Sequence, residues 1–369
     1  MRALILTCNT GGGHNACAKA LQQYYLDMGD SCDIADALSF VSEKFSRFMS
    51  WGHSTMYRRI PGLFKWGYGF TERHPSTLEE NGYAGRLFAM GTEKLYGFIV
   101  NGGYENVICT HVFSALLAGN VIRNYSLKIK TCFVATDYTC SPGTSASGLD
   151  YYFIPDESLT DEFVSQGIPK EKIIASGIPV KKEFYNKVSK PDAKSKFGIM
   201  EDGSHLVMMC GSMGCGPMEE LAEALSAKLS DRRELSIVCG TNEKLREELS
   251  ERYRFHPFIH VLGYVENMSL LLDSADLLLT KPGGLSTTEA AVKALPMVLV
   301  NAVAGCEEYN MNFFLGKGGA STADSTEKLA ELCRTLMDTP GNLLEMSKSL
   351  DDILKKNAAK IIHSKTLYH

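Results

Sequence analysis

Three glycine-rich loops carry the residue types that can do chemistry in this chain. They are Thr-Gly-Gly-Gly-His at 10–14, Gly-Ser-Met-Gly-Cys-Gly-Pro at 211–217, and Lys-Pro-Gly-Gly-Leu-Ser-Thr-Thr-Glu at 281–289. Glycines let backbone N–H groups approach a ligand closely, and a helix N-terminus adds partial positive charge. A single loop of this kind is better explained as a plain tight turn, but three of them favour an anionic, phosphate-containing ligand.

The third loop is the strongest of the three. Its glycines, hydroxyls and helix start form a candidate diphosphate cradle, and Glu289 lies one turn into the helix, within reach of ribose hydroxyls. Alternatively, Glu289 complements the helix dipole, a contribution of under ~1 kcal/mol.

Several motifs are missing from the sequence. No loop has the Gly-x4-Gly-Lys-Ser/Thr order of a P-loop, which argues against an ATPase. The first loop lacks Gly-x-Gly-x-x-Gly spacing, which argues against a dehydrogenase. No Asp-x-Asp occurs anywhere in the chain. We therefore expect no metal site and no cofactor, and backbone dipoles that neutralise the diphosphate instead.

The loops follow short apolar runs that predict parallel strands alternating with helices, an α/β fold. These runs are Ala3–Cys8, Asn106–Thr110, Lys130–Ala135 and Tyr151–Pro155, and then His205–Cys210, Leu235–Cys239, Phe258–Leu262, Leu277–Thr280 and Met297–Asn301. The 369 residues suit two domains. We expect one domain at 1–186, a second at 187–345, and a C-terminal helix at 346–369 that returns to the first.

Composition excludes some classes of protein. A net charge of -5 with 44% apolar residues is ordinary for a globular chain and argues against nucleic-acid binding. No apolar run approaches the roughly 20 residues of a membrane span, and no secretory signal is evident, so we expect a cytoplasmic location. The eleven cysteines lack a Cys-x-x-Cys pair and lie mostly in apolar runs, which predicts reduced core thiols.

Four motifs together resemble the family of monogalactosyldiacylglycerol synthases and processive diacylglycerol glucosyltransferases, within glycosyltransferase family 28. They are Leu6-Thr-Cys-Asn-Thr-Gly-Gly-Gly-His-Asn-Ala, Gly211-Ser-Met-Gly, Leu262-Gly-Tyr-Val and Lys281-Pro-Gly-Gly-Leu-Ser-Thr-Thr-Glu-Ala. The resemblance implies the GT-B fold, with two Rossmann-like domains facing across a cleft. The C-terminal domain would bind a UDP-sugar donor, and the N-terminal domain would receive the acceptor.

Residue by residue, the resemblance implies a donor site in the C-terminal domain. It places Gly263, Tyr264 and Val265 against uracil, Glu289 on ribose, and Gly283, Gly284, Ser286 and Thr287 on the diphosphate. Gly211, Ser212 and Met213 line the same pocket, with Gly12 and Gly13 on the N-terminal side. Glu307 and Glu308 are candidates for sugar recognition, or alternatively begin a surface helix.

His14 matches the histidine of the family's Gly-Gly-Gly-His loop. An inverting transferase must take a proton from the acceptor hydroxyl, and histidine titrates near working pH, so His14 is a candidate general base. Alternatively it binds a phosphate or backbone group at the helix start. His111 and Asp137, at neighbouring predicted strand ends, either orient His14 or act as the base themselves. The stretch at 138–144 lacks the histidine and tryptophan of many relatives, which leaves the acceptor open.

The segment Lys44–Arg73 interleaves basic and aromatic side chains and contains both tryptophans. Such a surface suits an anionic membrane, although its aromatics alternatively pack inward in a helical subdomain. The resemblance thus implies a peripheral hexosyltransferase on the inner face of the cell membrane, which moves glucose or galactose from a UDP-sugar to diacylglycerol with inversion, giving a β-glycolipid. Another lipid acceptor, polyprenyl-linked or already glycosylated, and a non-catalytic UDP-sugar-sensing regulator remain alternatives.

Overall fold

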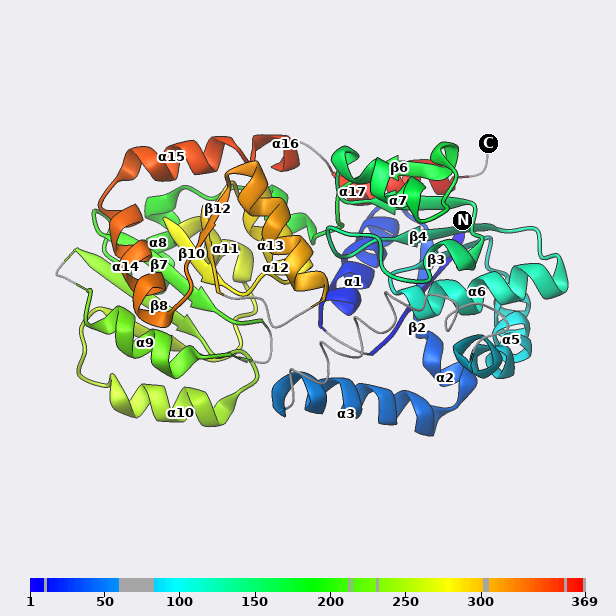
Figure 1. The fold of residues 1–369 in the computed structure, drawn as a ribbon, viewed down its shortest axis with the longest axis horizontal. Coiled ribbons are helices and arrows are strands. Elements are labelled where there is room, and N and C mark those ends of the chain that lie inside the picture. Colours follow the sequence, from blue (N-terminus) through cyan, green and yellow to red (C-terminus); the bar gives the residue numbers. More distant parts are fainter. Residues whose placement is uncertain are drawn as a thin grey trace. The chain divides into compact units, whose positions relative to one another are not determined.

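The computed structural model divides the chain into two α/β units (Figure 1). It describes residues 1–9, 12–59, 83–211, 214, 216–229, 232–300, 305–354 and 357–367. Unit 1 comprises Met1–Lys182, Val303–Tyr309 and Lys356–His369, and unit 2 comprises Glu183–Ala302 and Asn310–Lys355. The predicted fold class, two Rossmann-like α/β domains, is confirmed.

Unit 1 contains a parallel six-stranded sheet in the order β2-β1-β3-β4-β5-β6. Its elements are β1 (Arg2–Thr7), α1 (Gly12–Asp27), β2 (Ser31–Asp36), α2 (Ala37–Val41), α3 (Glu43–Arg59), α5 (Tyr83–Gly102), β3 (Asn106–Cys109), α6 (Val112–Tyr125), β4 (Lys130–Val134), η2 (Ser145–Ser147), β5 (Tyr151–Ile154), η3 (Glu157–Leu159), α7 (Thr160–Ser165), η4 (Lys170–Lys172), β6 (Ile173–Ala175) and α17 (Ala358–Thr366).

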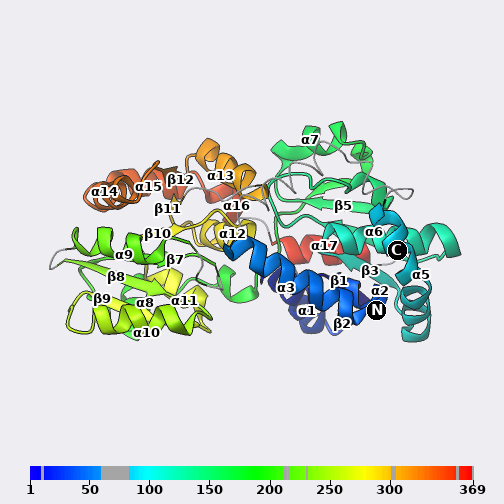
Figure 2. The same cartoon turned by 60° about the horizontal axis from the view of Figure 1, so that its bottom comes forward.

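Both faces of this sheet are buried, which explains why its inner strands are almost entirely apolar. Leu4 and Leu6 of β1 point to one face, where they pack in a cluster that includes side chains of α2, α5 and α6. Ala3 and Ile5 point to the other face, toward α1 and α17. Figure 2 shows α17, in red, on the same side of the sheet as α1, in dark blue. Residues far apart in the sequence therefore share one core.

The C-terminal helix is tied to unit 1 by polar contacts as well. His363 Nε2 lies 2.6 Å from Asp30 Oδ2, and the hydroxyls of Tyr25 and Thr366 lie 2.5 Å apart. Of the last three helices of the chain, only α17 belongs to unit 1. The other two, α15 (Pro340–Lys348) and α16 (Asp351–Leu354), belong to unit 2.

Unit 2 contains a second parallel six-stranded sheet in the order β12-β11-β10-β7-β8-β9. Its remaining elements are η5 (Lys182–Tyr185), α8 (Lys190–Phe197), β7 (Ser204–Met209), α9 (Met218–Ser226), β8 (Arg233–Val238), α10 (Glu243–Arg252), β9 (Ile259–Leu262), α11 (Met268–Ser274), β10 (Leu277–Thr280), α12 (Gly284–Val292), β11 (Met297–Leu299), β12 (Ala320–Thr322) and α14 (Thr326–Met337). Helix α13 (Cys306–Lys317) begins in unit 1 and continues in unit 2 from Asn310.

Unit 2 begins at Glu183, earlier than the boundary at 186/187 that the sequence suggests. Two side chains hold the start of this unit in place. Ser269 Oγ donates to the Glu183 carbonyl at 2.7 Å, and Lys293 Nζ donates to the Asn186 carbonyl at 2.6 Å. These bonds attach the segment to the body of unit 2, which is why the boundary precedes it.

The described cysteines form no disulfide, and all of them are buried except Cys306, which is half-buried. Burial raises the pKa of Cys17, Cys132 and their neighbours in the core, so these thiols stay protonated. Within the ranges given above, no helix is both long and apolar enough to cross a membrane.

Candidate functional site

Each sheet has one point where the strand order reverses, and ligands of open parallel sheets bind beyond the carboxyl ends of the strands at that point. In unit 1 the reversal lies between β1 and β3, and in unit 2 it lies between β7 and β10. The loop at 10–14 follows β1, and the loops at 211–217 and 281–289 follow β7 and β10. The described residues of all three glycine-rich loops therefore lie where the topology predicts a ligand.

In unit 1, three consecutive strand ends bring their polar groups together around the imidazole of His14. His14 lies in the first turn of α1, after β1, and its Nδ1 is 2.9 Å from the Thr110 carbonyl oxygen after β3. The same Nδ1 is 2.8 Å from Thr136 Oγ1 after β4. The ring of His111 lies edge-on to that of His14, with centroids 4.6 Å apart.

These contacts assign the tautomer of His14. A carbonyl oxygen only accepts hydrogen bonds, so at 2.9 Å from Thr110 O the Nδ1 atom must carry the proton. In the neutral ring, Nε2 then holds the lone pair. A backbone contact at Nδ1 thus leaves Nε2 as the atom that can accept a proton.

His111 is held in the opposite tautomer by the start of α6. It is the N-cap of that helix, and its Nδ1 accepts the Phe113 N–H at 3.0 Å. The Nδ1 lone pair is therefore occupied, and the neutral ring carries its proton on Nε2. His111 is a hydrogen-bond donor at Nε2, whereas His14 is an acceptor there.

Asp137 completes this cluster, which also includes a cysteine. Burial lowers the pKa of His14 below its ordinary value, and the Asp137 carboxylate and the Thr110 carbonyl oppose this effect. Because burial lowers its pKa, His14 is neutral near pH 7. Asp137 also accepts a hydrogen bond from the Cys306 thiol, and burial together with this carboxylate raises the pKa of that thiol.

Among the residues that the structure describes, no side chain caps the N-terminus of α12 in unit 2. Gly283 is the N-cap residue and no acidic residue lies in the first turn, which suits the backbone N–H groups from Gly284 onward to an anion. Asn310 of α13, fully buried, holds the preceding loop by donating to the Pro282 carbonyl at 3.0 Å. Gly284 is buried, and Ser286 is half-buried.

The hydroxyl of Thr287, one of the predicted phosphate ligands, is hydrogen-bonded within α12. The Thr287 side chain is fully buried, and its hydroxyl donates to the Gly283 carbonyl at 2.9 Å and to the Gly284 carbonyl at 3.2 Å. The hydroxyl is therefore satisfied within the helix. We assign Thr287 to holding the first turn of α12 rather than to phosphate contact.

The other predicted donor residues lie at the same edge of the second sheet. Gly263, Tyr264 and Val265 follow β9, with the Tyr264 side chain well exposed, and half-buried Glu289 lies in the second turn of α12. Gly211 follows β7 with a φ of 72°, in the left-handed region that favours glycine.

Glu307 is buried and Glu308 half-buried in the first turn of α13, where their negative charge suits the helix dipole. On the N-terminal side, Gly12 is exposed and Gly13 half-buried. Ser212 and Met213 lie outside the described residues.

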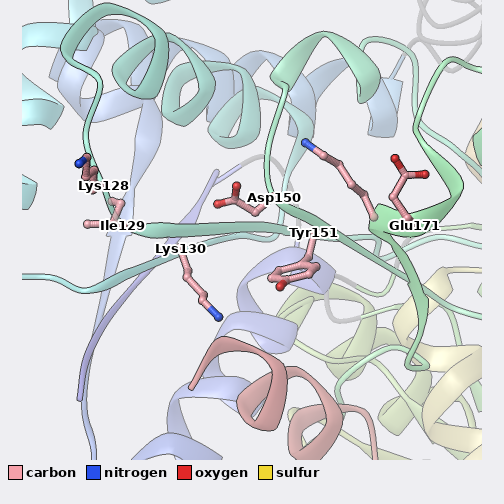
Figure 3. A pocket seen from close by; sticks show the side chains of 7 residues that line it. Lys128, Ile129, Lys130, Asp150, Tyr151 and Glu171 are labelled. Atoms are coloured by element: carbon pink, nitrogen blue, oxygen red, sulfur yellow. The ribbon is translucent and has the colours of Figure 1, made fainter. Parts of the chain in front are cut away.

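A hollow of about 370 Å³ lies at the opposite edge of the first sheet, at the amino ends of β4 and β5 (Figure 3). Its polar groups are used internally, since Lys172 Nζ donates to the Leu149 carbonyl at 2.9 Å and Asp150 accepts from Thr131. The Lys128 and Lys130 side chains point away from each other. This hollow lacks convergent groups and does not form part of the candidate site.

Two Rossmann-like units, each with its glycine-rich loops at the switch point, define the GT-B class of glycosyltransferases. Residues 14–180 match the monogalactosyldiacylglycerol synthase family, and residues 205–364 match the glycosyltransferase family 28 C-terminal domain. The chain belongs to this family of monogalactosyldiacylglycerol synthases and processive diacylglycerol glucosyltransferases within glycosyltransferase family 28.

Individual relatives support the assignment over the full length. The processive diacylglycerol beta-glucosyltransferase of Staphylococcus saprophyticus is 25% identical over 95% of this chain and 88% of its own length. The Bacillus subtilis protein of the same name is also 25% identical, over 98% of this chain and 93% of its own. The crystal structure of Acinetobacter baumannii MurG matches with a TM-score of 0.67 at 16% identity, covering 99% of both chains.

Proposed function

We propose that this protein transfers glucose or galactose from a UDP-sugar to the free hydroxyl of diacylglycerol, with inversion, to form a β-glycolipid. The observation that carries the proposal is the hydrogen bonding of His14, whose Nδ1 faces a backbone carbonyl and whose Nε2 therefore holds a lone pair. A non-catalytic sensor has no need of a neutral base held in this way. The names of the family relatives support the choice of donor and acceptor.

In this mechanism His14 Nε2 removes the acceptor proton while the acceptor oxygen attacks the anomeric carbon and UDP departs. Burial keeps the imidazole neutral and ready to accept the proton, and the nearby Asp137 carboxylate stabilises the imidazolium that forms. His111 is assigned a supporting role, because its Nδ1 is engaged in the α6 cap.

The leaving diphosphate is held by unit 2. The uncapped N–H groups at the start of α12 stabilise its negative charge, and Asn310 keeps the loop before them in position. Glu289 binds the ribose hydroxyls, and Gly263 to Val265 lie against uracil. Glu307 and Glu308 contact the sugar. Backbone donors thus replace a metal ion in this proposal.

The experiment that tests this function is mass spectrometry of lipid products, with a panel of UDP-sugars and diacylglycerol or a glycosylated lipid as acceptor. We expect a hexosyl-diacylglycerol product, formed in the presence of EDTA. Release of UDP only with a polyprenyl-linked acceptor would redirect the proposal to another lipid. Tight UDP-sugar binding with no turnover on any acceptor would show a sensor instead of an enzyme.

The donor site gives a direct prediction for Glu289. Its replacement with alanine should weaken UDP binding by about 1 to 3 kcal/mol, because a charged hydrogen-bond partner of the ribose is lost. Calorimetric titration with UDP measures the change. Glu251→Ala, which removes an exposed carboxylate on α10, is the matched control. Equal UDP affinity of Glu289→Ala and this control would show that Glu289 only complements the helix dipole.

We also propose that the protein is cytoplasmic and binds peripherally to the anionic inner face of the cell membrane through residues near 44–73. Of this segment, the structure describes the part up to 59. Four exposed side chains, Lys44, Arg47, Phe48 and Trp51, follow the i, i+3, i+4, i+7 spacing of one face of α3. Phe48 is 63% exposed and Trp51 65% exposed, with ring centroids 6.4 Å apart.

This face mixes the two kinds of side chain that peripheral helices use, because basic groups attract anionic lipids and aromatic rings favour the interface. Phe45 and Met49 pack instead against the core of unit 1. The alternative in which the aromatic side chains pack inward therefore applies to one side of α3, and the opposite side is available to lipid.

The two kinds of contact respond differently to salt. Lys44→Glu/Arg47→Glu should reduce vesicle binding mainly at low ionic strength, whereas Phe48→Ser/Trp51→Ser should reduce it at every ionic strength. Co-sedimentation with vesicles containing phosphatidylglycerol measures both effects. The control is Leu26→Ser/Met28→Ser, which changes two exposed apolar residues at the C-terminal end of α1. Equal sedimentation of all variants would exclude this face as the membrane contact.

A further inference from the structure

The side chain of Thr136 contacts the proposed base, and the sequence motifs give no sign of it. Thr136 follows β4 and is 7% exposed, and its Oγ1 lies 2.8 Å from His14 Nδ1. The Thr110 carbonyl oxygen lies 2.9 Å from the same nitrogen. Two oxygen atoms from two neighbouring strand ends therefore face one side of the imidazole.

These two oxygens constrain the ring differently. If the proton were on Nε2, the Thr136 hydroxyl could donate to Nδ1, but the Thr110 carbonyl oxygen would face an unprotonated Nδ1 at hydrogen-bond distance with no proton between them. With the proton on Nδ1, both oxygens accept from it and no repulsion remains. A backbone carbonyl selects the tautomer, and the Thr136 hydroxyl adds a second acceptor that limits rotation of the ring.

We propose that Thr136 is a positioning residue for His14, which limits rotation of the Nδ1-protonated ring and stabilises the imidazolium formed during transfer. This inference rests on the proposed function, in which His14 Nε2 is the base. When Nε2 accepts the proton, positive charge spreads to Nδ1–H, and its bonds to Thr110 O and Thr136 Oγ1 become charge-assisted. The hydroxyl therefore stabilises the charged form more than the neutral one.

Other titratable groups around His14 are the same with or without the hydroxyl. His111 of α6 lies edge-on to the ring, and Asp137 lies close enough to favour the charged form. The Cys306 thiol of α13 donates to Asp137. Because these groups are unchanged in a Thr136 variant, a shift of the His14 titration would report the lost hydroxyl.

Valine and serine separate the hydroxyl from the shape of the side chain. Thr136→Val keeps the branched shape and removes the acceptor, so turnover should fall about tenfold with an unchanged donor KM. Loss of a group that favours the imidazolium lowers the His14 pKa, so the acid limb of the rate profile should move to lower pH by about half to one unit. Thr136→Ser should restore both the rate and the position of the limb. Thr92→Val, which removes a buried hydroxyl from α5, is the control for stability.

The tautomer is also measurable without turnover, by long-range proton–nitrogen NMR correlation of histidine-labelled protein, with His14→Ala to identify the signals. We expect His14 to show a protonated Nδ1 and an unprotonated Nε2 in the wild-type protein. A protonated Nε2 would overturn the inference, as would a Thr136→Val variant with a wild-type rate and acid limb, or a Thr136→Ser variant as impaired as Thr136→Val. If His14→Ala itself keeps full turnover, the assignment of the base in the proposed function fails instead.

Discussion

Replacing His14 with alanine should lower turnover by about 10² to 10⁴, the usual cost of removing a general base, and leave UDP affinity close to that of the wild type. The structure separates these two properties, because His14 belongs to unit 1 and the proposed diphosphate site to unit 2. Steady-state rates with diacylglycerol measure the first property, and calorimetric titration with UDP measures the second.

A histidine outside the cluster provides the control for this variant. His256 Nδ1 accepts the Phe258 N–H in unit 2, and His256→Asn keeps an acceptor for that bond, so its turnover should match the wild type. If His14→Ala loses UDP binding in step with its rate, His14 is a phosphate ligand. The base would then be sought at Asp137, since the Nδ1 atom of His111 is already engaged.

The sequence predicts the inner strands well and the edge strands poorly, for a physical reason. Inner strands such as β1 and β10 are buried on both faces, so they read as continuous apolar runs. Three of the four edge strands, β2, β6 and β12, are only partly buried and have one neighbour each. The sequences of β2 and β12 are mixed and β6 has only three residues, so these strands were not predicted, whereas the fourth edge strand, β9, corresponds to the predicted run Phe258–Leu262.

The same distinction applies to the candidate site. The glycine-rich loops have a local signature, and their positions beyond β1, β7 and β10 follow from it. The contacts of Thr136 and Asn310 have none, because each depends on which loop lies next to the end of a neighbouring strand. Single polar residues such as these become informative only once the strand order is known.

No sequence motif predicts the buried ion pair that lies near the start of unit 2. Lys293 directly follows α12, and its side chain is 1% exposed, with Nζ 2.8 Å from Asp273 Oδ2. Asp273 is 5% exposed and also accepts the Val188 N–H at 3.2 Å. Burial lowers the pKa of Lys293 and the Asp273 carboxylate opposes this. The pair thereby links the C-terminus of α12 to the segment that opens the unit.

Removing one partner of this pair should be costly, because the other is left buried without compensation. Lys293→Met should destabilise unit 2 by about 3 to 5 kcal/mol. A chain with two domains has no single unfolding free energy, so hydrogen exchange of peptides from β7 and β10 is the suitable measurement. Lys328→Met, which breaks a pair that is 68% and 75% exposed, should leave the exchange of these peptides unchanged.

A double variant separates the lost attraction from the unpaired charge. In Lys293→Met/Asp273→Asn the amide oxygen still accepts the Val188 N–H, and no charge remains buried, so exchange should slow again relative to Lys293→Met. If the double variant exchanges as fast as the single one, the lysine acts through its bond to the Asn186 carbonyl rather than through Asp273. If Lys293→Met exchanges no faster than the wild type, the pair does not stabilise the unit, and the packing around Ser269 and Leu271 holds the segment instead.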